Sequence, residues 1–397
     1  MFPARHAEDY VSMTQRNPRI LLVFLAGTAT IIGLGGCAPA TTPGAIATPA
    51  HGTQHTPVKH VPPAIDMTAP AARANLPCTS LATQAQITGH QGPVTLVQPA
   101  AEAAGDLADA SNLIPSSDYI REAGGLGCLW SAGPVDHSVA AENNVPSYIE
   151  ITVQFDAAHA WSLEGPAIGL DPNDPSDGGE CDVDNVGSIC QLDHLVGAST
   201  WIDILARHST GSDDTQAIHD AVIASVTAAG TPAAPPLPQS GTLSLGTQCT
   251  DFASTSAVQS ALGSSAAITA STPDQGADDV IIPEEYAAQD TLKDHPCIFT
   301  AGTATVAQLA WLPGGAWAWA EDKTQPLADA PLQSLHLTGL AVHDGAWIRC
   351  AAANASCIVD LTLGGNWIEV AVPATSTAAN KRSAVTALAQ AVVTKLG

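Results

Sequence analysis

Eight of the nine cysteines form two sets of four with nearly the same spacing. The first set is Cys78, Cys128, Cys181 and Cys190, and the second is Cys249, Cys297, Cys350 and Cys357. The steps along the chain are 50, 53 and 9 residues in the first set and 48, 53 and 7 in the second. An even number of cysteines in an exported chain predicts disulfides. We therefore expect four disulfides with a structural role, since no Cys-x-x-Cys redox motif occurs.

Eight cysteines allow 105 connectivities, but a repeated pattern leaves only three for each set. We favour the pairs Cys78–Cys128, Cys181–Cys190, Cys249–Cys297 and Cys350–Cys357. The two close pairs suit a clasp across a strand turn. The two distant pairs would tie a first helix to the sheet.

Two further clusters could bind ligands. Carboxylates gather near glycines at Asp171, Asp174, Asp177 and Glu180, and calcium takes six to eight oxygen ligands. The spacing is not that of an EF-hand, and the second half has no equivalent, so the cluster is a weak calcium candidate. A solvated acidic loop is the favoured interpretation, and we assign no metal.

Tryptophans are the second candidate cluster. Trp311, Trp317 and Trp319 flank the turn signal Pro313-Gly314-Gly315, so we expect Trp317 and Trp319 on one face of a strand. Trp317 has a counterpart, Trp161, in the first half, which favours a role in packing. Trp311 and Trp319 lack a matching tryptophan and are the candidate ligand-facing residues, because indole faces bind sugars and apolar groups.

No sequence motif for catalysis is found. The chain lacks a Gly-x-Ser-x-Gly elbow, a His-Glu-x-x-His helix, a Walker loop and a dinucleotide-binding glycine pattern. None of its 13 histidines lies in a recognisable nucleophile–base arrangement. We therefore assign no catalytic residue and no cofactor.

The ninth cysteine, Cys37, lies at the end of an export signal. Arg16 and Arg19 precede an uncharged run over residues 20–36, which ends in Leu34-Gly35-Gly36. A basic start, a short apolar run and small residues before a cleavage site are typical of a signal peptide over residues 1–36. Met13 is an alternative start that would give a more compact signal.

The residues Leu34-Gly35-Gly36-Cys37 resemble the bacterial lipobox. This resemblance implies that lipid is attached to the Cys37 thiol, that the chain is cut before it, and that the protein is anchored on the extracytoplasmic face of the cell membrane. Residues 37–77 are rich in Ala, Thr and Pro with little charge, and such a segment is expected to be a disordered tether.

The charge of the chain excludes some partners. Without residues 1–36, 10 basic and 36 acidic residues remain, a net charge of −26. Nucleic-acid binding needs clustered Lys and Arg, and attraction to an anionic lipid surface needs basic residues too. We expect no nucleic acid, and contact with the membrane only through the lipid.

The cysteine spacing belongs to a tandem duplication, with repeats over residues 78–230 and 246–397 and a Pro-rich linker over 231–245. Residues 151–161 align with 307–317, and 199–204 with 365–370. Period-two alternation at Ile149, Ile151, Val153 and Phe155 predicts a strand with one face in the core. Each repeat begins with a short helix near its first cysteine and ends with a longer one, the last capped by Ser376 or Thr377. The fold class is α+β, with two duplicated two-layer domains, each an antiparallel sheet with flanking helices and two disulfides.

Pro77-Cys78 and Cys128-Leu129-Trp130 resemble actinobacterial lipoprotein domains of unknown function. They are also similar to the extracellular sensor domain of mycobacterial serine/threonine kinases. The resemblance implies surface exposure and a ligand cleft, and it is weaker in the second repeat, which has Gln248-Cys249 and Cys297-Ile298-Phe299.

The leading functional hypothesis is a non-enzymatic, membrane-anchored lipoprotein that binds a ligand or a protein partner in the cell envelope. One alternative is an inhibitor of a secreted enzyme, because tandem α+β repeats with disulfides occur in β-lactamase inhibitor proteins. The other is a cell-wall hydrolase with an unrecognised motif.

Overall fold

The computed structural model describes residues 68–97, 113–133, 146–168, 180–184, 187–208, 215–236, 242–272, 283–324 and 331–397. All of them belong to one compact unit of the chain, His60–Gly397. Cys37, the signal and most of the predicted tether lie outside the described residues, as do Asp171, Asp174 and Asp177.

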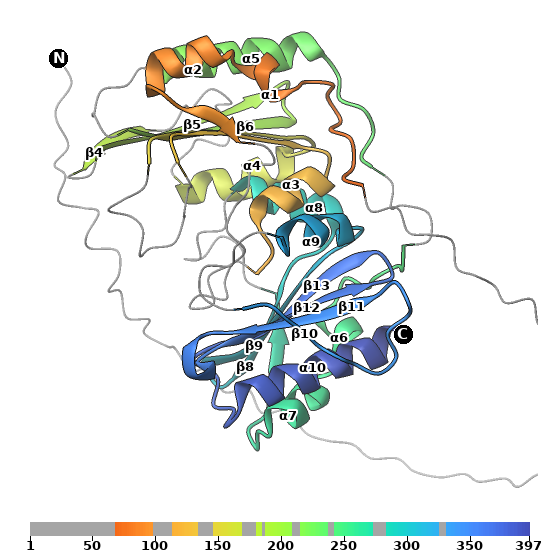
Figure 1. Cartoon of the computed structure of the whole chain (residues 1–397). Helices are drawn as coiled ribbons and strands as arrows, with labels where there is room; N and C mark the ends of the chain where they lie inside the picture. The colour runs from red at the N-terminus through yellow and green to blue at the C-terminus, as the bar shows by residue number, and fades with distance from the viewer. Residues whose placement is uncertain are drawn as a thin grey trace, which may run out of the picture. The chain divides into compact units, whose positions relative to one another are not determined.

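The first repeat forms helices and strands in a defined order (Figure 1). They are α1 (Cys78–Leu81), α2 (Gln84–Gln91), β1 (Thr95–Val97), α3 (Ser116–Glu122), β2 (Leu126–Ser131), β3 (Tyr148–Gln154), α4 (Ala158–Glu164), β4 (Glu180–Asp184), β5 (Gly187–Val196), β6 (Thr200–His208) and α5 (Gln216–Ala229). A 3-10 turn, η2 (Gly165–Ile168), follows α4.

The second repeat follows the same order. Its elements are α6 (Cys249–Phe252), α7 (Thr255–Leu262), β7 (Thr269–Ser271), α8 (Pro283–Leu292), β8 (Cys297–Ala301), β9 (Ala304–Leu312), α9 (Ala316–Asp322), β10 (Gln333–Ser334), β11 (Gly345–Cys350), β12 (Cys357–Leu363), β13 (Asn366–Val372) and α10 (Lys381–Leu396). The short strand β10 and the 3-10 turn η3 (Ala352–Asn354) are additions to the shared plan.

The two sheets have the same topology. The first has the order β1-β2-β3-β6-β5-β4, and the second, from its other end, β7-β8-β9-β13-β12-β11 followed by β10. Every strand pair is antiparallel. The expected α+β fold and tandem duplication are therefore confirmed.

One face of each sheet packs on the helices that open and close its repeat. In the first repeat, Ile149, Ile151, Val153 and Phe155 all lie in the apolar core that also holds Val222 of α5. The period-two prediction for this strand is confirmed. Figure 1 shows α2 and α5 on one side of the sheet and α4 on the other.

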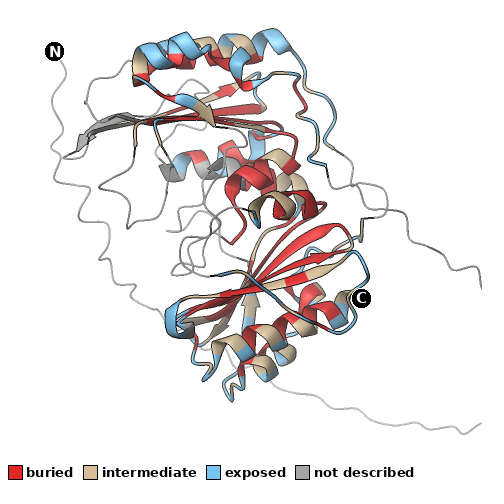
Figure 2. Cartoon of the chain, viewed as in Figure 1, coloured by how far each residue is buried: buried red, intermediate tan, exposed pale blue. Residues whose placement is uncertain are grey.

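The opposite face of each sheet is covered partly by a helix from the other repeat. Tyr119 and Ile120 of α3 lie in an apolar cluster with Trp317 and Trp367 of the second repeat. Conversely, Tyr286 of α8, in the second repeat, lies in an apolar cluster with Trp161 and Trp201 of the first repeat. Helix α8 packs against β3, α4 and α3. This reciprocal exchange adds a shared helical layer to the predicted two layers. Its residues are largely buried (Figure 2).

The predicted disulfides are confirmed where both side chains are described. Cys78–Cys128, Cys249–Cys297 and Cys350–Cys357 are formed. Cys190 is also disulfide-bonded, and Cys181 lies directly opposite it in the β4–β5 register. The side chain of Cys181 is outside those described.

Two local predictions need correction. The segment after Pro313 is helix α9 rather than a strand, because Gly314, with φ of +79°, turns the chain and Gly315 caps a run of helix-forming alanines. The last helix begins at Lys381, where the side chain of Asn380 accepts a hydrogen bond from the Ser383 N–H. It is therefore capped by Asn380, not by Ser376 or Thr377.

The first repeat begins before the predicted boundary at residue 78. Arg73 is buried and forms an ion pair with Asp156 at 2.7 Å. Its guanidinium also donates to the carbonyl of Ala233 in the linker. Residues 68–77, which we call the N-terminal arm, are thus fixed to the first repeat rather than part of a free tether.

Among the described residues, no helix is both long and apolar enough to cross a membrane.

Candidate functional site

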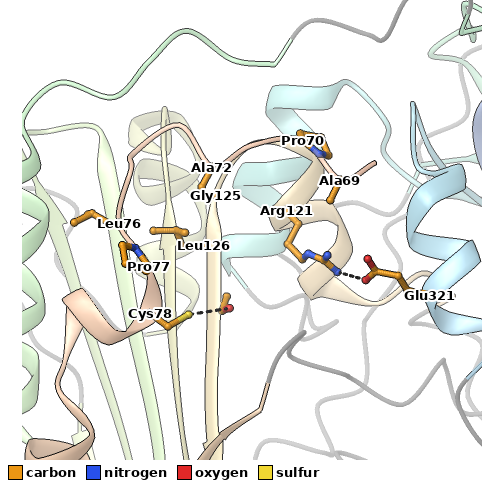
Figure 3. A pocket seen from close by; sticks show the side chains of 11 residues that line it. Ala69, Pro70, Ala72, Leu76, Pro77, Cys78, Arg121, Gly125, Leu126 and Glu321 are labelled. Atoms are coloured by element: carbon orange, nitrogen blue, oxygen red, sulfur yellow. Dashed lines mark hydrogen bonds and ion pairs between the residues drawn. The ribbon is translucent and has the colours of Figure 1, made fainter. Parts of the chain in front are cut away.

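A groove of about 480 Å³ lies between the N-terminal arm and the start of β2 (Figure 3). The arm contributes apolar side chains, among them Pro70, Leu76 and Pro77, and β2 contributes Leu126. At Gly127 a side chain would meet nothing within 4 Å, so the backbone borders open space there. The groove is therefore lined by these apolar side chains together with about as much polar surface, to which Arg121 and Glu321 contribute.

An ion pair forms the polar end of the groove. Arg121 of α3 and Glu321 of α9 approach to 3.0 Å, and both line the groove. Arg121 also contacts Asp118 at 3.4 Å and lies over the Trp317 ring at 4.3 Å. Three neighbours thus hold the guanidinium in place, whereas the Glu321 side chain keeps 40% of its surface exposed.

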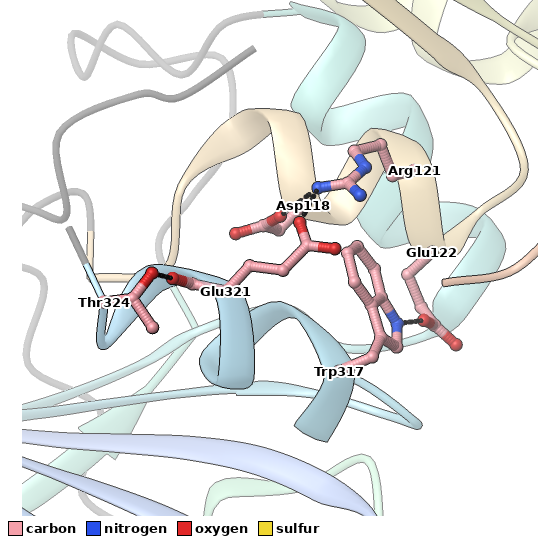
Figure 4. Close-up of polar contacts among 6 residues, drawn as sticks. All are labelled: Asp118, Arg121, Glu122, Trp317, Glu321 and Thr324. Atoms are coloured by element: carbon pink, nitrogen blue, oxygen red, sulfur yellow. Dashed lines mark hydrogen bonds and ion pairs between the residues drawn. The ribbon is translucent and has the colours of Figure 1, made fainter. Parts of the chain in front are cut away.

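The same two helices meet through a buried acid (Figure 4). The Trp317 indole N–H donates to Glu122 at 2.6 Å. A side chain at Gly314 would come within 2.5 Å of the other Glu122 oxygen, so glycine leaves the space that the carboxyl fills. Burial raises the pKa of Glu122 to about 7, although the hydrogen bond from Trp317 opposes this shift.

A second acid from α9 meets α3. The carboxyl of Asp322 lies against that of Asp118. Burial is the largest cause that raises the pKa of Asp322 to about 7, and the nearby Asp360 adds to it. Two carboxylates in contact at a buried site repel each other, so this contact favours the protonated form of one acid.

Each sheet also carries a buried pair of acids on the face that receives the exchanged helix. In the first repeat Asp193 and Asp203 lie directly opposite on β5 and β6 and share a hydrogen bond. The Trp201 indole donates to Asp193 at 2.7 Å, and Gln191 donates to Asp203 at 3.2 Å. Burial raises the pKa of Asp193 to about 6, despite these hydrogen bonds.

The second repeat has the same arrangement, and here a cation contacts both acids. Asp360 and Glu369 lie opposite each other on β12 and β13. The Trp367 indole donates to Asp360 at 3.3 Å, and Arg349 donates to Glu369 at 2.5 Å. Burial raises the pKa of both acids even though Arg349 opposes it.

These acid pairs were not predicted from the sequence, although a signal was present. Trp201-Ile202-Asp203 aligns with Trp367-Ile368-Glu369, and the aligned acids share a face with the tryptophan two residues before them. An acid that recurs at a buried strand position in both repeats indicates a paired carboxyl.

The candidate tryptophans are core residues. Trp311 and Trp319 are each 1% exposed, so neither faces a ligand. Trp311 packs on Phe252 at 4.2 Å between ring centroids, and Trp319 packs on Trp347 and Trp367. Trp311 aligns with Phe155, which lies in the core of the first repeat. The position is therefore a core position in both repeats, and the absence of a matching tryptophan did not indicate an exposed one.

The calcium candidate lies mostly outside the described residues. Only the backbone of Glu180 is described, as the first residue of β4. Among the described residues, no cluster of three or more His, Cys, Asp or Glu side chains is arranged to hold a metal ion.

Comparisons with protein-family models, curated proteins and solved structures found no match to this chain.

Proposed function

We propose that this chain is a lipid-anchored, extracytoplasmic binding protein that holds a small ligand in the groove beside Arg121 and Glu321 without transforming it. The observation that carries this proposal is the groove itself, a space of mixed apolar and polar lining that ends in an ion pair. Small-molecule sites are typically concave spaces of roughly 300–1,000 Å³ in which a few placed polar groups orient the ligand.

The residues of the groove suggest the chemistry of the ligand. Pro70, Leu76 and Leu126 favour an apolar body. Glu321, the more exposed member of the ion pair, favours a positively charged or hydrogen-bond-donating group at one end. The proposed ligand is a small amphipathic molecule with such a group.

Two features support the location. Leu34-Gly35-Gly36-Cys37 has the pattern that is lipidated in bacteria, and the disulfides Cys78–Cys128 and Cys249–Cys297 suit an oxidising compartment.

The first test is mass spectrometry of the full chain purified from membranes. We expect diacylglycerol on Cys37, cleavage before this residue, and a co-purifying small molecule. An unmodified Cys37 in membrane-extracted protein would contradict the anchoring part of the proposal.

The second test places the ligand in the groove. Glu321→Gln removes the exposed carboxylate without changing its shape, and Asp220→Asn removes a carboxylate on α5, outside the groove. We expect Glu321→Gln to lose at least tenfold in affinity for the co-purifying molecule and Asp220→Asn to bind normally. Equal binding by both variants would exclude the groove, and turnover of the molecule by the wild type would show an enzyme instead.

A further inference from the structure

We propose that the contact between α3 and α9 is proton-dependent: it is closed while Glu122 and Asp322 are protonated, and it loosens when they ionise. Arg121 and Glu321 belong to the same two helices and line the groove, so a change of pH would alter the wall of the groove. This inference concerns the contact and does not depend on what the groove binds.

The first part of the argument is the enclosure of Glu122. The residue is 7% exposed, and its carboxyl is packed between the Trp317 indole and the backbone of Gly314. An indole donates one hydrogen bond but carries no charge, so it does not neutralise a carboxylate. Ionised Glu122 would therefore be a poorly compensated buried charge.

The second part is the carboxyl–carboxyl contact between Asp118 and Asp322. With both groups ionised, two negative charges would face each other in a buried site, and one acid must therefore keep its proton for the contact to form. One acid comes from α3 and the other from α9, so ionisation pushes the two helices apart.

The charged groups around these acids come from every neighbouring element. On α3 they are Asp118 and Arg121, and on α9 they are Glu321 and Lys323. Lys323 lies over the Trp347 ring. The sheet behind Asp322 contributes Arg349, Asp360 and Glu369, with Asp360 raising the Asp322 pKa. On α8, which packs on α3, Asp290 pairs with Lys293 and with His159.

These neighbours do not supply the missing charge. Arg121 is already shared between Asp118 and Glu321, and Arg349 between Asp360 and Glu369. Among the described residues, the acids in this region outnumber Arg121, Lys323 and Arg349, so protons make up the difference.

The direction of the pH effect follows from the raised pKa values. The pKa of Glu122 is about 7 in the closed contact and 4.5 in water. The closed form is therefore favoured most below pH 4.5, and this advantage disappears as the pH rises to 7. The opening equilibrium constant should rise about tenfold per pH unit for each titrating carboxyl in this range, and then level off.

The test is hydrogen–deuterium exchange of the full chain between pH 5 and pH 8, with rates corrected for the intrinsic exchange at each pH. We expect peptides covering α3 and α9 to lose at least tenfold in protection over this range, while α10 stays protected. The double variant Glu122→Gln/Asp322→Asn keeps the shape of both acids but cannot ionise, and its α3 and α9 peptides should show no such loss.

Asp193→Asn is the matched control, because it removes a buried acid with a raised pKa that lies away from the α3–α9 contact. It should leave the pH dependence of α3 and α9 as in the wild type. The single variant Glu122→Gln replaces the double variant if near-ultraviolet circular dichroism shows that the latter is not folded. The same loss of protection in wild type and variant, or a parallel loss in α10, would overturn the proposal.

Discussion

At the scale of single residues, both sheets place two acids directly opposite each other on neighbouring strands. Like charges at such positions destabilise a sheet, so each pair needs a proton or a neutralising partner. Burial raises the pKa of Asp193, and Gln191 donates to Asp203. In the second repeat, Arg349 pairs with both Asp360 and Glu369. The duplicated element is therefore the acid pair with its tryptophan.

The pair in the first repeat should give the protein a measurable pH dependence. The pKa of Asp193 is 3.8 in water and about 6 in the fold, so its stabilising effect is complete below pH 3.8 and is lost by about pH 6. At 1.36 kcal/mol per unit, this is roughly 3 kcal/mol. In the variant Asp193→Asn the amide oxygen still accepts the hydrogen bond from Trp201, but the side chain does not titrate. The free energy of unfolding, measured in urea between pH 4 and 6.5, should therefore fall less steeply with rising pH in Asp193→Asn than in the wild type. The control Asp220→Asn should show the same slope as the wild type.

Arg349 is the only cation in contact with the second pair among the described residues, and it is 2% exposed. Arg349→Met keeps the aliphatic stem but leaves two buried acids without their partner. Breaking a buried ion pair in this way typically costs about 3–5 kcal/mol. Arg382→Met is the control, because Arg382 is partly exposed and bonds Gln333. In urea unfolding at pH 7, Arg349→Met should unfold at a lower urea concentration than Arg382→Met. Equal unfolding midpoints for the two variants would show that Arg349 does not stabilise the pair.

At the scale of helices and strands, the disulfides differ in the length of chain that they close. Cys78–Cys128 closes 50 residues and ties α1 to β2, whereas Cys350–Cys357 closes 7 across β11 and β12. The loop-entropy model gives about 4 kcal/mol for the first and about 2 kcal/mol for the second.

Replacing both cysteines of each pair by serine tests this difference. We expect Cys78→Ser/Cys128→Ser to lower the free energy of unfolding about twice as much as Cys350→Ser/Cys357→Ser, measured by urea unfolding with the other disulfides intact. A larger loss in the short pair would mean that local contacts of the β11–β12 turn, not the closed loop, determine its effect.

Much of each repeat could be predicted from local pattern, since period-two strands and cysteine spacing are visible in the chain itself. The helix at Trp317 was not predicted, because Pro-Gly-Gly signals a turn but does not say which element follows. The groove and the α3–α9 contact join residues about 200 positions apart, such as Arg121 and Glu321. Aligning the two repeats shows which residues occupy the same position in each fold. It does not show which residues of one repeat contact the other repeat.

At the scale of the whole described body, the exchange of α3 and α8 makes the repeats interdependent. Without its partner, each repeat would expose an apolar sheet face that includes Trp201 or Trp367. The linker is also fixed at both ends, since Ala233 bonds the N-terminal arm and Leu243 bonds Gly364.

Separately expressed repeats should therefore fail to fold. We expect residues 68–236 and 242–397 alone to lack native near-ultraviolet circular dichroism and to bind the hydrophobic dye ANS. A full chain that is cut at a protease site inserted between Pro236 and Thr242 should stay folded, because the exchanged helices remain in place. A native spectrum for either isolated repeat would show that the exchange is dispensable.

The exchange of α3 and α8 also has a consequence for the origin of the chain. An ancestor with a single repeat would have needed a second, identical molecule to cover its sheet, and two copies trading one helix each would have formed a symmetric dimer. Joining the two copies in one gene makes that encounter intramolecular, so assembly no longer depends on the amount of protein in the cell. The fused halves were then free to differ, and the aligned acids Asp203 and Glu369 record such a difference.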